Sequence, residues 1–334
     1  MNNIINIDKD LRVPKYKQII NSIYLAIENG LLHKGDKIDS INSICEKFSL
    51  SRDTVLVAFK ELKAKGILMS TPGKGYYIKS TNIKSRERIF LLFDELNAFK
   101  EDLYNSFLKS LNAETKVDIY FHHFNRSVFN SIIKDNIGNY SKYVIMPASF
   151  QNFYPLFDEL PQEKVYFLDQ TKAEFKNRYP GVFQNFEKDM YSALNSGKDL
   201  LAKYKKLILV FPGGKEPKGQ QAGFLKYSVE NNWDHEIISN PFKRDIKKGE
   251  VYIVPNDRHL VYLVKKVNEK KQKLGKDIGI ISYNDTPLKE IVEGGITTIS
   301  TNFKKMGETL AELIKTKKKA QVENPSSLII RKSL

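Results

Sequence analysis

The chain has 334 residues, of which 41% are hydrophobic and 11% aromatic, and its formal net charge at pH 7 is +15. This composition excludes a disordered chain, because it supplies enough apolar surface for sizeable cores. The length predicts two or three domains. The basic charge suits a polyanionic partner, but it is spread over the whole chain and is only supporting evidence for one.

The single cysteine, Cys45, excludes an internal disulfide and any multi-cysteine metal site. It lies among the apolar positions of an expected helix, so we expect a buried thiol. The N-terminal residues lack the features of a signal peptide, and no uncharged apolar run approaches the ~20 residues that span a membrane. We therefore expect a cytoplasmic protein without membrane partners. His122 and His123 are neighbours on an expected strand and point to opposite faces, so we expect no metal or other cofactor.

Residues 1–80 have the pattern of three helices followed by a hairpin. Apolar residues recur at helical spacing from Tyr16 to Ile27, and Gly30 ends that helix. Ser40 and Ser51 each precede a further helix as N-cap residues. Two short strands, at 67–70 and 76–79, flank a Pro-Gly-Lys-Gly turn. The pattern predicts a winged helix-turn-helix, which binds DNA or, less commonly, serves only as a protein-interaction module.

The start of the third helix carries the residue types that DNA recognition needs. The N-terminal residues of a recognition helix reach base edges, and Arg52 can donate two hydrogen bonds to guanine from that place. The hydroxyls of Ser51 and Thr54 suit phosphate contacts, which the helix dipole favours. We expect Lys74 at the wing tip to meet the DNA backbone or minor groove, and Gly75 to let the main chain approach closely.

Five short stretches within residues 12–80 carry a family likeness: Gly30-Leu31, Gly35-Asp36-Lys37-Ile38, Ser51-Arg52-Asp53-Thr54-Val55, 62–66 and Gly73-Lys74-Gly75-Tyr76. With them the segment resembles the GntR family of bacterial transcription regulators. Members commonly have a Leu-Pro-Ser-x-Arg run before the second helix. The corresponding run here keeps Ser40 as an expected DNA contact but lacks the proline and the arginine. Another family arginine is replaced by Leu56, so the resemblance implies that Arg52 carries more of the base reading than usual.

The pattern changes after a polar, non-periodic segment at 81–87, which we interpret as a linker. Beyond it, helical segments alternate with short apolar runs. The expected strands are 89–93, 117–121, 143–146, 165–168, 207–211, 251–254, 278–282 and 297–300, and the expected helices include 99–111, 189–203, 220–230 and 259–273. This alternation predicts an α/β fold of doubly wound parallel sheets. Because residues 88–334 exceed one comfortable domain of this kind, we expect two lobes.

Polar side chains follow nearly every expected strand, where ligands of such sheets bind. Carboxylates, amides and hydroxyls together suit a hydroxyl-rich ligand, because each buried polar group must be paired. The same residue types also favour turns and helix caps. Phe99, Phe150 and Phe153 could stack on a sugar face or belong to the core. The candidate ligand-binding residues at these strand ends are Asp94, Ser149, Asp169, Asn256, Asp257, Asn284 and Asp285.

The stretches Val254-Pro255-Asn256-Asp257, Ile280-Ile281-Ser282-Tyr283-Asn284-Asp285, 295–299, Met306-Gly307 and 328–333 carry a second likeness. With them residues 87–334 resemble the type I periplasmic-binding-protein fold of lactose-repressor-type (LacI) regulators. The resemblance implies that Asp189, Asp257 and Asp285 bind sugar hydroxyls. Many relatives have a sugar-binding arginine three residues before a Gly-Phe pair. That position is Gln220 here, so any contact there is uncharged.

These patterns lead to the hypothesis of a ligand-responsive transcription regulator rather than an enzyme. Its winged-helix head would bind operator DNA as a homodimer, for example as a repressor, and its lobes would bind a monosaccharide or its phosphate. Two other hypotheses stay open. The C-terminal part could be a sugar-modifying α/β enzyme, which would turn over a bound sugar, or a domain that only dimerises and binds no small molecule.

Overall fold

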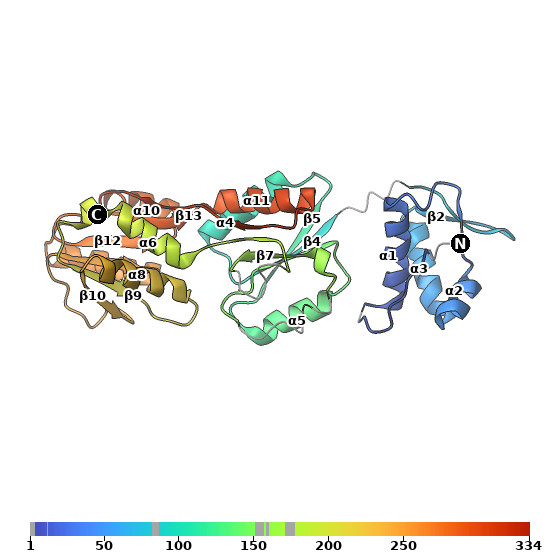
Figure 1. The fold of residues 1–334 in the computed structure, drawn as a ribbon, viewed down its shortest axis with the longest axis horizontal. Helices are drawn as coiled ribbons and strands as arrows, with labels where there is room; N and C mark the ends of the chain where they lie inside the picture. Colours follow the sequence, from blue (N-terminus) through green and yellow to red (C-terminus); the bar gives the residue numbers. More distant parts are fainter. Residues whose placement is uncertain (1–3, 12, 82–86, 151–156, 158–159, 171–177) are drawn as a thin grey trace.

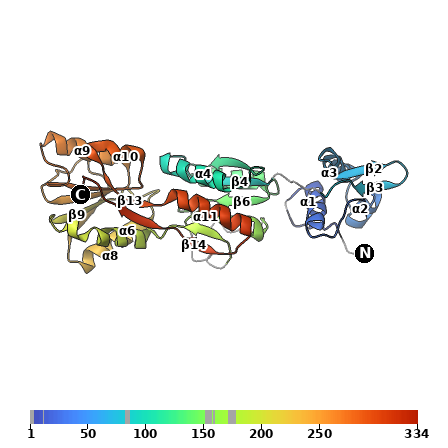
Figure 2. The ribbon, with the colours of Figure 1, turned by 90° about the horizontal axis from the view of Figure 1, so that it is seen from above.

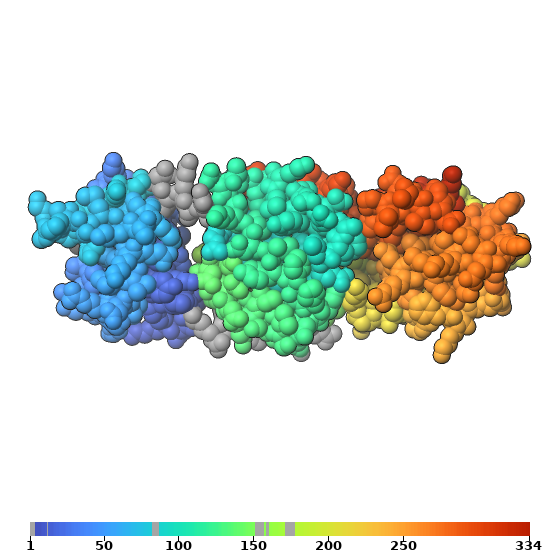
Figure 3. All heavy atoms as spheres, turned by 180° about the vertical axis from the view of Figure 1, so that it is seen from behind, coloured from blue at the N-terminus to red at the C-terminus, as the bar shows by residue number. Residues whose placement is uncertain are grey.

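The computed structural model describes residues 4–11, 13–81, 87–150, 157, 160–170 and 178–334. Three bodies follow one another along the molecule, which we call the head, lobe 1 and lobe 2 (Figures 1 and 3). Most of the expected linker, and Phe153, lie outside the described residues. None of the helices within these ranges is long and apolar enough to cross a membrane.

The head is the predicted winged helix-turn-helix. Its elements are α1 (Lys15–Glu28), β1 (Lys37–Ile38), α2 (Ile41–Phe48), α3 (Arg52–Ala64), β2 (Leu68–Thr71) and β3 (Gly75–Ile78). The predicted hairpin is present, and the unexpected strand β1 pairs antiparallel with β3, in the order β1-β3-β2. Val55, Phe59 and Leu62 of α3 are fully buried. The expectation of a buried Cys45 was wrong in degree, because the thiol is half-buried at the edge of the head core.

Lobe 1 is built on a parallel six-stranded sheet. Its elements are β4 (Arg88–Phe93), α4 (Ala98–Ser110), β5 (Lys116–Phe121), α5 (Arg126–Asn136), β6 (Lys142–Ile145), η2 (Gln162–Lys164), β7 (Val165–Asp169), β8 (Gly181–Phe183), α11 (Phe303–Thr316) and β14 (Gln321–Glu323). The strand order is β14-β8-β7-β6-β4-β5, and every pairing is parallel. The two strands that sequence did not predict, β8 and β14, have only three residues each.

Lobe 2 contains a second six-stranded sheet, in the order β10-β9-β11-β12-β13-β15. Only the pairing of β13 with β15 is antiparallel. The expected helix at 189–203 is in fact two helices that meet at Gly197. The elements are α6 (Phe186–Ser196), α7 (Lys198–Leu201), β9 (Lys206–Val210), α8 (Lys218–Glu230), β10 (Asp234–Ile238), β11 (Glu250–Val254), α9 (Asp257–Glu269), β12 (Gly279–Tyr283), α10 (Pro287–Ile291), η4 (Val292–Gly294), β13 (Thr297–Thr301) and β15 (Ser326–Ile329).

Helices cover both faces of each sheet, as continuous apolar strands require. Alternate residues of β4 pack against α4 and α11 on one face and against α5 on the other. In lobe 2, α6 and α8 cover one face and α9 the other (Figure 2). Two glycines allow close helix pairs. A Cβ at Gly307 of α11 would lie 2.2 Å from Ser106 Oγ of α4, and a Cβ at Gly223 of α8 would lie 2.2 Å from the Glu187 carbonyl oxygen of α6.

The chain passes between the lobes three times, after β8, after β13 and between β14 and β15. Asn324, which is buried, ties these crossovers together. Its side-chain amide donates to Thr301 Oγ1 (2.7 Å) and to the Asn302 carbonyl oxygen (2.9 Å), and its backbone N–H donates to the Phe183 carbonyl oxygen (2.8 Å). One residue therefore forms hydrogen bonds with the other two connections as well as lying in the third.

The head contacts lobe 1 through residues that precede and begin α1. Val13 is buried in the apolar cluster of lobe 1 that includes Phe129 and Ile133 of α5. A Cβ at Gly138 would lie 2.8 Å from Val13 Cγ1, so this glycine makes room for it. The Lys17 ammonium donates to the Asn139 side-chain oxygen. Lobe 1 therefore holds the head at a second point, besides the chain connection between β3 and β4.

We predict that Asn324→Ala lowers the free energy of unfolding by about 1–3 kcal/mol, because it removes two buried hydrogen bonds. At about 2–4 °C for each kcal/mol, thermal unfolding would register the loss. The exposed Asn112 provides a control, and Asn112→Ala should leave the midpoint unchanged. Equal midpoints for the two variants would contradict the role given to Asn324.

Candidate DNA-binding and ligand-binding sites

The N-terminus of α3 presents Arg52 to solvent. Ser51 caps the helix, because its hydroxyl oxygen accepts from the Thr54 N–H (3.2 Å) and lies 2.8 Å from Thr54 Oγ1. Arg52 is exposed and makes no hydrogen bond or ion pair with any described residue. Ser40 caps α2 in the same way by accepting from the Ser43 N–H (3.1 Å). The guanidinium is therefore available to a partner, while both serine oxygens already hold helix ends.

The wing adds a second cationic element. Lys74 is exposed in the turn between β2 and β3, and Tyr77 donates a hydrogen bond to its carbonyl oxygen (3.2 Å). Gly75 has φ +110°, a region that favours glycine, and a Cβ there would lie 3.2 Å from Lys37 Cε. Sequence reasoning did not single out Lys37 as a DNA contact. Lys37 lies beside the wing because strand β1 pairs with β3. A strand of only two residues is too short to be predicted from the sequence.

Buried polar groups gather at the carboxyl ends of the lobe 1 strands. Asp94 at the end of β4 forms a buried ion pair with Lys100 of α4. Asp169, the last residue of β7, is buried and accepts a hydrogen bond from the Gln184 side-chain amide. Gln184 Oε1 has no partner among the described residues. Asp94 and Asp169 were predicted here, whereas Lys100 and Gln184 were not.

Lobe 2 contains a second group of buried polar residues. Asp189 in α6 is 7% exposed, Gln220 in α8 is 4% exposed, and Tyr283 at the end of β12 is 3% exposed. Asp189 Oδ2, Gln220 Oε1 and the Tyr283 hydroxyl all lack a hydrogen-bond partner among the described residues, as does the Asn284 side-chain oxygen. Buried polar atoms are normally paired, so these unpaired atoms mark a candidate ligand site.

The charges of two carboxylates, Asp189 in lobe 2 and Asp169 in lobe 1, both act on the buried Tyr283 hydroxyl. Burial raises the pKa of Tyr283, and the negative charges of Asp189 and Asp169 raise it further, while Gln220 lowers it. Burial likewise raises the pKa of Asp169 to about 6 and that of Asp189 to about 7. We call Asp169, Gln184, Asp189, Gln220 and Tyr283 the interlobe cluster. It joins three predicted residues, Asp169, Asp189 and Gln220, which are 20 or more positions apart in the sequence.

The remaining predicted residues have other surroundings. Asp285 accepts two hydrogen bonds from the Arg331 guanidinium (2.7 and 2.8 Å) and one from Thr298 (3.0 Å). Asp257 is exposed and lies 3.0 Å from Lys289 Nζ, while Asn256 caps α9 by accepting from the Arg258 N–H (2.8 Å). Ser149 is exposed. Each of these carboxylates already has a cationic partner in the protein.

The aromatic candidates that the structure describes belong to packed clusters. The Phe99 ring lies 4.7 Å from the Phe303 ring of α11. The Phe150 ring lies 5.2 Å from the ring of His122, a buried residue whose Nε2 is 3.0 Å from the Met146 carbonyl oxygen. His123, its neighbour in sequence, is exposed. The expectation that both histidines lie on a strand was wrong, because β5 ends at Phe121 and His123, with φ +48°, lies in the turn that follows.

An ion pair at the surface connects lobe 1 with lobe 2. Lys215, in the segment between β9 and α8, lies 2.9 Å from Glu95 Oε1, which follows β4 in lobe 1. The same ammonium lies 5.3 Å from the centre of the Phe124 ring. Because Lys215 is exposed and Glu95 only half-buried, this contact is weak and screened by salt. Such a bridge lets the lobes separate at little cost.

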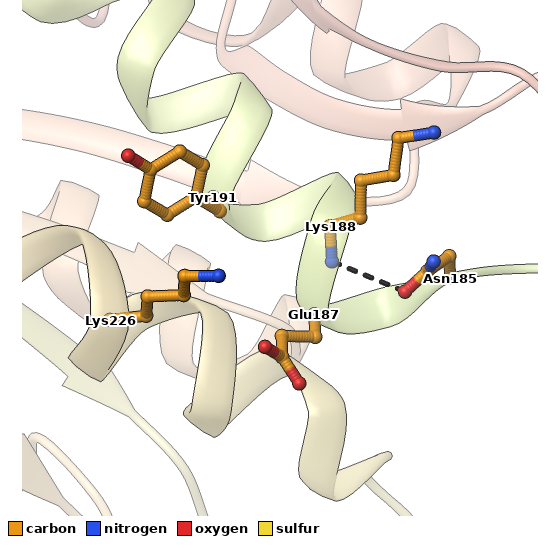
Figure 4. Close-up of a pocket in the computed structure, with 5 residues that line it drawn as sticks. All are labelled: Asn185, Glu187, Lys188, Tyr191 and Lys226. Atoms are coloured by element: carbon orange, nitrogen blue, oxygen red, sulfur yellow. Dashed lines mark hydrogen bonds between the residues drawn. The ribbon is translucent and has the colours of Figure 1, made fainter.

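A separate pocket of about 310 Å³ lies on the surface of lobe 2 between α6 and α8 (Figure 4). Asn185, Glu187, Lys188, Tyr191 and Lys226 line it, and the Asn185 side chain accepts from the Lys188 N–H (3.3 Å). None of the predicted ligand-binding residues lines this pocket. We place the candidate ligand site at the interlobe cluster instead, because there the unpaired polar atoms are buried.

The fold and its two sites define a class: a winged-helix DNA-binding head joined to a two-lobed binding domain. Residues 15–78 match the family of bacterial regulatory proteins called gntR, and residues 225–334 match the periplasmic binding protein-like domain. The chain therefore combines a GntR-type helix-turn-helix domain with a periplasmic-binding-protein-like domain, as the sequence motifs predicted.

Curated relatives match mainly the head. The chain is 41% identical over 64 residues to the transcriptional regulator YdfD of Bacillus subtilis, which is 19% of this chain and 13% of that protein. It is 43% identical over 53 residues to the regulator LutR of the same organism, which is 16% of this chain and 24% of that protein. It is 26% identical over 124 residues to the repressor YtrA of B. subtilis, which is 34% of this chain and 95% of YtrA. The chain thus spans less than a quarter of YdfD and LutR.

Solved structures match the two lobes. A LacI family regulator from Silicibacter pomeroyi has a TM-score of 0.62 at 12% identity, covering 74% of this chain and 98% of that one. A LacI-type regulator from Alkaliphilus metalliredigens in complex with D-xylulofuranose (TM-score 0.58, 13% identity) has the same coverages. A LacI family regulator from Weissella paramesenteroides with bound sucrose (TM-score 0.58, 14% identity) covers 74% and 97%. At these identities the likeness establishes the fold.

The raised pKa of Asp189 predicts how stability depends on pH. A folded-state pKa of about 7, against 3.8 otherwise, gives a contribution to stability that is complete below about pH 4 and lost as the pH rises to about 7. Asp189→Asn removes the buried charge, so it should raise the unfolding temperature above pH 7 and have little effect near pH 4. Thermal unfolding from about pH 4 to about pH 8 would measure this, with Asp199→Asn, an exposed carboxylate of the same lobe, as the control. A pH-independent difference would refute it.

Proposed function

We propose that this protein is a transcription regulator, not an enzyme, whose affinity for operator DNA changes when a small sugar-like molecule binds between its lobes. One observation carries the proposal: both lobes of a domain that is joined to a DNA-binding head contain buried polar atoms that have no partner among the described residues. The two sugar complexes among the structural neighbours support a sugar-like ligand. A DNA-binding role implies the cytoplasm as its location.

The candidate residues of the head and of the lobes would have different roles. Arg52 would read bases in the major groove, Lys74 and Lys37 would neutralise phosphates, and the hydroxyls of Ser51 and Thr54 would contact phosphates at the positive end of α3. At the interlobe cluster, Asp169 and Asp189 would accept hydrogen bonds from ligand hydroxyls. A ligand that binds residues of both lobes would then stabilise their closed arrangement.

We infer that the protein acts as a homodimer. One short recognition helix reads too few bases for useful specificity, so two heads are needed. Lobe 2 offers a surface for this contact: Leu288 and Ile291 of α10 are 70% and 72% exposed, and Val261 of the adjacent α9 is 52% exposed. Asp257 and Lys289 connect these two helices, which lie side by side in Figure 2. A patch of large apolar residues of this kind is typical of a protein interface.

This arrangement explains how a ligand could move the heads. The heads are held by lobe 1, through Val13 and the chain connection, whereas the proposed dimer contact lies on lobe 2. Rotation of lobe 1 against lobe 2 would therefore change the distance between the two recognition helices. Coupling of this kind typically amounts to about 1–3 kcal/mol, or about 5–150-fold in affinity.

The proposed function predicts that a sugar stabilises the protein and changes its affinity for DNA. A ligand at 100 times its dissociation constant adds ~2.7 kcal/mol to the free energy of unfolding, which corresponds to several degrees at about 2–4 °C for each kcal/mol. Thermal unfolding against pentoses, hexoses, deoxyhexoses and their phosphates identifies the ligand. The change in operator affinity, about 5–150-fold, is then measured with that sugar. No shift with any sugar would contradict the ligand assignment and leave the head unaffected.

A second prediction tests the head. With an operator selected from random DNA, Arg52→Ala should weaken binding by about 1–3 kcal/mol and relax the sequence preference at one position. Lys74→Ala should weaken binding to all sequences and reduce its dependence on salt. Lys109→Ala, at an exposed lysine of lobe 1, serves as the control. Unchanged affinity and preference in Arg52→Ala would show that α3 does not read bases.

A further inference from the structure

We propose that the ligand of the interlobe cluster is a cation, a sugar-like molecule that carries a protonated amine, rather than a neutral sugar or a sugar phosphate. This inference rests on the proposed function, because it specifies the chemical class of the ligand at the same site. It follows from the types of the unpaired atoms and from the charges around them.

The unpaired atoms of the cluster are mainly hydrogen-bond acceptors. Gln184 donates through its amide nitrogen to Asp169, which fixes its oxygen as the atom left unpaired. Asp189 Oδ2 is an acceptor at any pH at which the group is ionised, and the Gln220 oxygen lies in the same region. The Tyr283 hydroxyl can also donate, as can either carboxyl group when it is protonated. A ligand that completes this site must therefore supply several N–H or O–H donors in a small volume.

The charges of the cluster are not balanced within the protein. Asp169 and Asp189 are buried and form no ion pair among the described residues. The two nearby buried lysines have other partners. Lys100 is paired with Asp94, and the Lys289 ammonium donates to the carbonyl oxygens of Tyr283 (2.9 Å) and Asn284 (2.7 Å) and lies 3.0 Å from Asp257. No described residue thus forms an ion pair with either carboxylate, although the charge of Lys100 lowers the pKa of Asp169, and a buried charge without a close counter-ion is strongly unfavourable.

A protonated amine meets both requirements at once. An ammonium group has three donors and one positive charge, so it pairs unpaired acceptors and neutralises a carboxylate in the same contact. A neutral sugar satisfies the acceptors but leaves both carboxylates unbalanced. A phosphate adds acceptors and negative charge beside Asp169 and Asp189, where no described cation is free to receive it. Gln220 is uncharged and cannot supply that balance either.

The test compares three epimeric hexoses, each as the free sugar, the 2-amino sugar and the N-acetylated amino sugar. Glucose, galactose and mannose and their derivatives would be titrated calorimetrically into the full-length protein at neutral pH. We expect one amino sugar to bind about tenfold or more tightly than both its N-acetylated form and its parent sugar. Asp189→Asn should abolish that preference, and Asp199→Asn should retain it. Asp169→Asn provides a second variant with the same expected loss.

The outcomes separate this inference from the proposed function. Binding of a parent or N-acetylated sugar at least as tight as that of its amino form would overturn the cationic ligand and leave a sugar-responsive regulator. A preference for the amino sugar that persists in both Asp189→Asn and Asp169→Asn would overturn the role of the carboxylates. Binding of none of the nine compounds would overturn the cationic ligand together with the sugar-binding function.

Discussion

The burial of strand ends between two lobes is the constraint on which the binding domain depends. The chain crosses between the lobes three times, and Asn324 holds these crossovers together, so the carboxyl ends of both sheets meet at one place. Polar residues favoured at strand ends are thereby removed from water. In a single-lobed protein they would be solvated turn residues. Here Asp169 and Asp189 become buried charges, and their raised pKa values follow mainly from that burial.

In the head, local hydrogen bonds determine which groups are left for DNA. Ser40 and Ser51 use their side-chain oxygens to cap α2 and α3. The turn at Ser49, whose backbone is left-handed, fixes these two helices relative to each other. Arg52 has no such task. A rigid helix end with one uncommitted guanidinium is a preorganised recognition element, because little conformational freedom has to be lost elsewhere when DNA binds.

The sequence predicted the architecture well because apolar periodicity and buried parallel strands are local signals. It could not predict short or edge strands such as β1 and β14, whose pairing depends on distant partners. For the ligand site, residue type at a strand end predicted Asp169 and the resemblance to LacI-type regulators implied Asp189, and the structure buries both side chains. The ion pair of Asp285 with Arg331, 46 positions away, was not visible, since nothing in either segment indicates the contact. No role was predicted for Tyr283 itself, and only the structure shows that its hydroxyl is buried where the charges of Asp189 and Asp169 act on it.

Val13 packs into lobe 1, and this packing limits how DNA-binding heads can be exchanged between such proteins. Sequence patterns suggest that the head ends near residue 80, and a head exchanged at that boundary would carry its own residue 13 into a foreign lobe. The recipient would then keep the space beside Gly138 but receive a side chain that was not selected to fill it. Head and lobe 1 are thus complementary surfaces, not interchangeable modules. New pairings of DNA target and effector would require matched changes on both sides of that contact.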